Sequence, residues 1–94
     1  NWRFEELKNL DRILEESKVF RNCLAASYAQ QIIEGQYVAF RMSHPDVRLP
    51  LILGCRIVNG QVIFDQLEYP NNQKAEAEYS NIAMHFINWL NLQA

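Results

Sequence analysis

The sequence predicts an α+β fold in which two N-terminal helices and one C-terminal helix pack on a three-stranded antiparallel sheet. Apolar residues at helical spacing near both ends of the chain predict the helices, and alternating, β-favouring segments between them predict the strands. The 94 residues have the length of one domain, since domains most often contain roughly 100–150 residues. We therefore expect a single domain over residues 1–94, with an N-terminal helix in 1–18 and the main part of the domain in 19–92.

The first helix is predicted over residues 2–17 and the second over residues 19–34. In the first, apolar side chains recur at intervals of three and four, with charged residues on the opposite face. Gly35 is expected to end the second helix, because glycine readily adopts the left-handed conformation of a helix C-terminus. A last helix is predicted from about Ala75 to Leu92. Its buried stripe is expected to contain Tyr79, Ile82, Ala83, Phe86, Trp89 and Leu90.

Three strands are predicted, from Tyr37 to Met42, from Leu49 to Val58 and from Gln61 to Tyr69. The dipeptide Asn59-Gly60 is typical of a two-residue type I′ turn, whose two central residues both have positive φ. The second and third strands are therefore expected to form a hairpin.

A two-residue loop fixes the register of this hairpin. The expected pairs are 58/61, 57/62, 55/64, 53/66 and 51/68. Side chains of alternate pairs share a face, so Gln66 is expected opposite Leu53 on the apolar face of the hairpin. An unsatisfied buried amide costs about 1–3 kcal/mol, so Gln66 needs hydrogen-bond partners there. Such conflicts between pattern and chemistry are more frequent at functional sites than elsewhere.

The composition argues against several classes of function. The formal net charge is −2 and the basic residues are scattered, so no basic stripe for nucleic acid is present. No apolar run approaches the ~20 residues that span a bilayer, and no signal-peptide pattern opens the chain. We expect a cytoplasmic protein that binds no membrane. Because the chain begins with Asn1 and not with Met, we expect either an engineered start or a fragment of a longer protein.

The cysteine and histidine pattern predicts neither a metal site nor a cofactor. The two cysteines, Cys23 and Cys55, lie in apolar-patterned segments and are expected to be reduced and unpaired with each other. The two histidines, His44 and His85, are isolated, and no pair of cysteines has metal-ligand spacing.

Two blocks of sequence resemble the PcfJ-like family, which is encoded on conjugative plasmids, phages and other mobile elements. The first runs from Arg21 through Cys23 and Tyr28, followed by Gly35 before a strand. The second contains Gln66 and the run Tyr69-Pro70-Asn71-Asn72, and Trp89 matches a tryptophan of the family's last helix. The resemblance covers roughly residues 19–91. It departs from the family at Asn22, where many members have histidine, and in a Cys-to-Tyr spacing one residue longer.

The resemblance implies a domain of a mobile-element or phage-associated protein, involved in processes such as conjugation. It implies no established catalytic activity. The expected function is a non-catalytic interaction or ligand-recognition module with a protein partner. Its candidate binding residues are Cys23, Tyr28, Gln66, Asn71 and Asn72.

The alternative function is a thiol-dependent hydrolase or transferase with Cys23 as nucleophile. A cysteine near a helix N-terminus has a lowered thiol pKa, but the reaction also needs a base within hydrogen-bond reach. Neither His44 nor His85 falls on a strand beside Gln66, where a base would be placed. The non-catalytic function is therefore favoured. An exposed tryptophan, either Trp2 or Trp89, would be further evidence for a partner.

Overall fold

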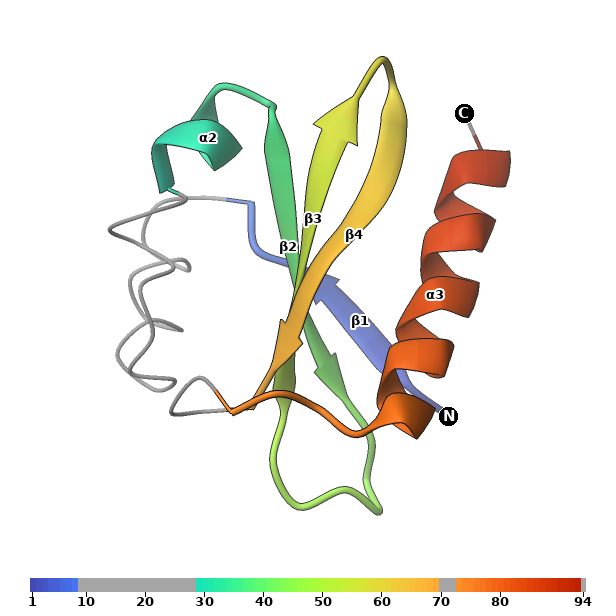
Figure 1. Cartoon of the computed structure of the whole chain (residues 1–94). Helices are drawn as coiled ribbons and strands as arrows, with labels where there is room; N and C mark the ends of the chain where they lie inside the picture. The colour runs from blue at the N-terminus through green and yellow to red at the C-terminus, as the bar shows by residue number, and fades with distance from the viewer. Residues whose placement is uncertain (9–28, 70–72, 94) are drawn as a thin grey trace.

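The structure is a computed structural model that describes residues 1–8, 29–69 and 73–93. Its elements, in chain order, are β1 (Arg3–Glu6), α2 (Ala29–Ile33), β2 (Tyr37–Ser43), β3 (Leu51–Val58), β4 (Gln61–Glu68) and α3 (Ala77–Leu92). In this part of the chain the strands form one four-stranded antiparallel sheet in the order β1-β2-β3-β4. Helices α3 and α2 lie on opposite sides of the sheet, and the N-terminus lies beside the first turn of α3 (Figure 1).

The expectation of a helix over residues 2–17 is wrong at its start, because residues 3–6 form β1. This strand pairs with β2 from Arg3↔Ser43 to Glu6↔Phe40, which makes the sheet four-stranded and not three-stranded. Tertiary contacts explain the difference. The Phe4 ring stacks on Phe86 of α3, with ring centroids 3.9 Å apart. Long-range pairing therefore overrides the local helical spacing.

The second N-terminal helix is also not found as expected. In place of a helix over 19–34, the described residues contain only the five-residue helix α2, and residues 9–28 lie outside the described part. The predicted end of this helix is confirmed. The amide of Gly35 donates to Ile32 O at 3.1 Å, and the amide of Gln36 donates to Gln31 O at 2.9 Å. These two bonds form the Schellman motif that closes many helices.

The predicted hairpin is confirmed, with Asn59-Gly60 as its two-residue loop between β3 and β4. Asn59 has φ 50° and Gly60 has φ 78°, so both residues have the positive φ that a type I′ turn requires. The start of the register is confirmed too, from Val58↔Gln61 through Cys55.

The core lies between α3 and one face of the sheet. Its buried members come from three strands and the helix: Phe40, Met42, Leu51, Leu53, Cys55, Leu67, Ala83 and Ile87. The opposite face of the sheet also contains buried residues. Tyr37, Ala39 and Ile52 are at most 2% exposed there.

Helix α3 begins at Ala77 and ends at Leu92, close to the expected bounds. Its predicted stripe is largely confirmed, since Ala83 is buried and Tyr79, Ile82, Phe86 and Leu90 pack against the core. Trp89 is the exception, because its side chain is 55% exposed, although its ring stacks against Phe86 of the same helix. No helix among the described residues is long and apolar enough to cross a lipid bilayer.

Candidate functional site

A β-bulge interrupts β4 at Asp65. Cys55 pairs with Phe64, but the next residue of β3, Gly54, pairs with Gln66, so Asp65 is an extra residue on β4. Bulges of this kind bend the strand and redirect side chains, and they are frequent beside functional sites. Aspartate is also disfavoured within strands, so its position is the local sequence feature that marks the irregularity.

The bulge overturns the expected environment of Gln66. The predicted pairs 53/66 and 51/68 are replaced by Gly54↔Gln66, Leu53↔Leu67 and Ile52↔Glu68. Leu67 therefore takes the position on the α3 face that was expected for Gln66, and it is 5% exposed. Gln66 lies with Gly54 on the opposite face, where its side chain is half-buried. The cause is the extra residue in β4. It shifts the register by one residue, and such a shift moves each following side chain to the other face of the sheet.

Tyr37 of β2 contacts the bulge from across β3. Its hydroxyl donates to Asp65 Oδ2 at 2.7 Å, and Arg56 Nε lies 4.0 Å from the other carboxylate oxygen. The tyrosine reaches Asp65 by passing over Gly54. A Cβ atom at position 54 would collide with the Tyr37 hydroxyl and would lie 3.1 Å from Cγ of Gln66. Glycine is thus required at this crossing by close approach and not by its φ.

The outer edge of β4, the side away from β3, is covered at two places. At one end the side-chain amide of Asn91 accepts from Val62 N–H at 2.8 Å and donates to Val62 O at 3.0 Å. At the other end residues 73–75 run antiparallel beside the strand, with a bridge between Glu68 and Lys74. Their main chain accepts from Tyr69 N–H at 2.8 Å and donates to Leu67 O at 3.1 Å.

Between these two covered ends lies a stretch that we call the edge gap, alongside residues 64–66. A pocket of about 320 Å³ opens here, lined by residues 64–68 of β4 and, across from them, by Lys74, Ala75 and Ser80. The residues that line it carry two carboxylates, an ammonium, a hydroxyl and the Gln66 amide, together with the apolar side chains of Phe64 and Leu67. This mixture of polar and apolar groups is typical of ligand-binding pockets.

Burial changes the titration of two groups near the gap. It raises the pKa of the Glu68 carboxyl, an effect that the positive charge of Lys74 opposes. It also raises the pKa of the Cys55 thiol to about 12, with a further contribution from the negative charge of Asp65. Cys55 is a free, fully buried thiol. At neutral pH it stays protonated and is a poor nucleophile.

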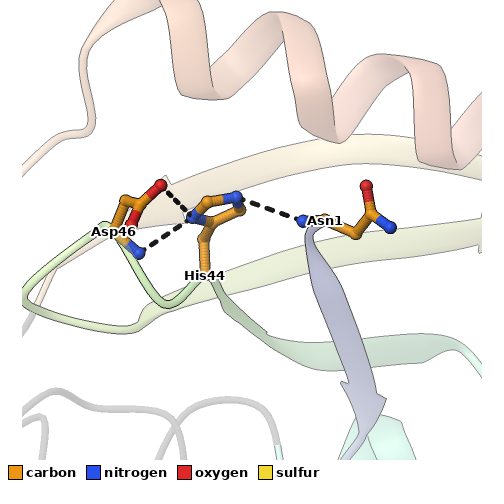
Figure 2. A network of polar contacts seen from close by, with 3 residues as sticks. All are labelled: Asn1, His44 and Asp46. Atoms are coloured by element: carbon orange, nitrogen blue, oxygen red, sulfur yellow. Dashed lines mark hydrogen bonds and ion pairs between the residues drawn. The ribbon is translucent and has the colours of Figure 1, made fainter.

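A second cluster of aromatic and polar residues lies where β1 begins. The His44 ring follows β2, accepts from Asp46 N–H at 3.0 Å, and has its other nitrogen 3.3 Å from the Asn1 nitrogen (Figure 2). The Trp2 ring lies 5.2 Å from His44 and 5.5 Å from Tyr79. These contacts join β1, the loop after β2 and α3, so the cluster has a structural role.

The start of α3 is joined to the end of β4 by one further bond. The Tyr69 hydroxyl donates to the Glu76 carboxylate. Desolvation, together with this hydrogen bond, raises the pKa of Tyr69, and the same bond lowers the pKa of Glu76. The bond keeps the turn into α3 close to β4, and with it the wall of the pocket.

Of the five residues predicted to form a binding site, the structure places only Gln66, in the wall of the pocket. Cys23, Tyr28, Asn71 and Asn72 lie outside the described residues, so their convergence with Gln66 stays a prediction. Within the described ranges, no cluster of three or more His, Cys, Asp or Glu side chains could hold a metal ion.

Sequence reasoning missed two residues that define the edge gap. Asn91 bonds Val62, which lies 29 positions away, and no local pattern reveals that contact. Lys74 lies in a short bridge that has no strand pattern of its own.

Comparisons of the chain with protein-family models, with curated proteins and with solved structures found no match.

Proposed function

We propose that the chain is a non-catalytic interaction and ligand-recognition module whose binding site is the edge gap of β4. The observation that carries this proposal is the pocket between the two covered ends of that edge, with Gln66 among its lining residues. Gln66 was singled out by its conflict with the apolar pattern. The bulge resolves that conflict by placing Gln66 opposite Gly54, on the face away from α3.

The chemistry of the pocket suits recognition. One of its polar groups, the Asp65 carboxylate, is fixed by the Tyr37 hydroxyl, and the backbone at Glu68 is paired with that of Lys74. Groups held in this way bind a ligand without a large loss of side-chain entropy. The exposed Trp89 ring is a second feature that supports a partner, since tryptophan is enriched in binding surfaces.

The PcfJ-like identity and the association with mobile elements and phages belong to the same proposal and rest on the sequence resemblance. A thiol-dependent reaction at Cys23 stays the alternative. A Cys23→Ser variant tests this alternative, because it abolishes a reaction that needs the thiol and leaves the lining of the edge gap at residues 64–68 unchanged.

The proposal is tested with two probe libraries, random heptapeptides and small polar fragments, each screened against the chain. Ligands of the edge gap should bind the Gln66→Ala variant about fivefold more weakly, which corresponds to one lost hydrogen bond of about 1 kcal/mol. Gln61→Ala is the matched control, because Gln61 is an exposed glutamine of the same strand outside the pocket. Isothermal titration calorimetry measures the affinities. Equal affinity of all ligands for the two variants would contradict the proposal.

A further inference from the structure

The backbone of Phe64 points into the edge gap. In an antiparallel pair, the N–H and C=O groups of successive residues point to opposite sides of the strand, so those of every second residue point to the same side. Val62 directs both groups outward, since both bind the Asn91 amide. Phe64 follows two residues later, before the bulge, and its N–H and C=O therefore also point outward. The rest of the described chain offers these two groups no hydrogen-bond partner.

The chain itself shows what chemistry this edge accepts. At Val62 the edge is bound by an amide that supplies one donor and one acceptor, as a neighbouring strand does. At Glu68 it is bound by residues 73–75, which occupy the position of a fifth strand. Two separate parts of the molecule thus use the same row of backbone groups, and Phe64 lies between them.

We infer that the edge gap binds an extended segment of a partner polypeptide, which adds to β4 as a short fifth strand paired with Phe64. This inference rests on the proposed function and names the class of its ligand. The segment has room for roughly three residues at about 3.3 Å each, because Asn91 and Ala75 close the two ends. Main-chain hydrogen bonds supply the affinity of such strand addition, and side-chain pockets supply its specificity.

The length limit distinguishes this site from an open sheet edge. A long strand cannot run along β4 without displacing the Asn91 amide or residues 73–75. An open edge pairs with any exposed strand and promotes aggregation, and a covered edge does not. The two covered ends therefore restrict pairing to a short segment that enters the pocket.

Amide hydrogen exchange tests the inference, with a heptapeptide from the library as the probe. In the free chain the Phe64 amide should exchange much faster than the Ile63 amide, which points toward β3. A saturating peptide should slow exchange at Phe64 by at least tenfold and leave Ile63 unchanged. A peptide with an N-methyl group at the pairing residue should bind at least tenfold more weakly, and one methylated at its first residue should bind normally.

Each other outcome has a definite meaning. A peptide whose affinity depends on Gln66 but which leaves Phe64 exchange unchanged overturns strand addition and leaves the proposed function standing. The same holds if only small fragments bind at the gap. If Phe64 is already protected in the free chain at high concentration, and dilution removes the protection, the occupant is a second copy of this chain and the inference is wrong. If no probe responds to Gln66→Ala, the proposed function fails first.

Discussion

At the scale of single residues, the shape of the site depends on Gly54 and on the ring that crosses it. Tyr37 reaches Asp65 only because position 54 has no side chain. The extra residue of β4 is thereby bonded to Tyr37 of β2, and Gln66 lies opposite Gly54 and in the lining of the pocket. One glycine, one tyrosine and one aspartate thus set the geometry of the bulge.

This dependence predicts a coupling between positions 54 and 37. Gly54→Ala should lower the free energy of unfolding by about 1–3 kcal/mol, the usual cost of overpacking. In a Tyr37→Phe background the same substitution should cost at least about 1 kcal/mol less, because the colliding hydroxyl is gone. Urea unfolding of the four proteins of this cycle measures the coupling. Equal costs of Gly54→Ala in both backgrounds would show that the crossing of Tyr37 over Gly54 does not constrain the bulge.

At the scale of elements, helix α3 has two functions. Its inner face forms the core with the sheet, and Asn91 in its last turn binds the edge of β4. The second function does not depend on the apolar face of the helix, since it uses the side-chain amide of Asn91. It closes one end of the edge gap.

The edge contact of α3 predicts a specific effect of Asn91→Ala. The variant frees Val62 N–H and C=O and should lose about 1–2 kcal/mol of stability for the two bonds. It should also self-associate more strongly, because the open edge is longer. Asn88→Ala is the control, since Asn88 is an exposed asparagine of the same helix. Sedimentation velocity measures the association. If the Asn91→Ala and Asn88→Ala variants are both monomeric at the same concentrations, the Asn91 amide does not prevent pairing at the edge of β4.

The elements also show what the sequence could predict. The hairpin, β2 and α3 were predicted because each has a strong local pattern, such as Asn59-Gly60 or the apolar stripe of the helix. Strand β1 was missed because residues 3–6 are too few to show a period of two. Its strand conformation depends on pairing with β2 and on the stack of Phe4 against Phe86.

The candidate site was predicted only in part, for a related reason. Gln66 stood out because a polar side chain broke an apolar alternation, and the structure places it in the pocket wall. The register beyond Phe64 could not be derived, since a bulge depends on contacts such as that of Tyr37 with Asp65 across 28 positions. The covered ends of the edge depend on contacts that are equally distant in sequence.

At the scale of the whole molecule, several surfaces of the described residues compete as the place where a ligand binds. They include the edge gap, the exposed side of α3 at Trp89, and the aromatic end at Tyr69 and Tyr79, where a further pocket of about 290 Å³ lies. The edge gap differs from the others in combining polar side chains with outward-pointing backbone groups. The central claim is that ligands bind there.

Chemical-shift mapping tests this claim most directly. The chain, labelled with ¹⁵N, is titrated with a heptapeptide selected against it, and the amide shifts of all residues are followed. The account predicts that the largest changes occur at residues 64–66 and at Ala75, on the two walls of the pocket. Changes concentrated at Trp89, or at Tyr69 and Tyr79, with residues 64–66 unaffected, would contradict it.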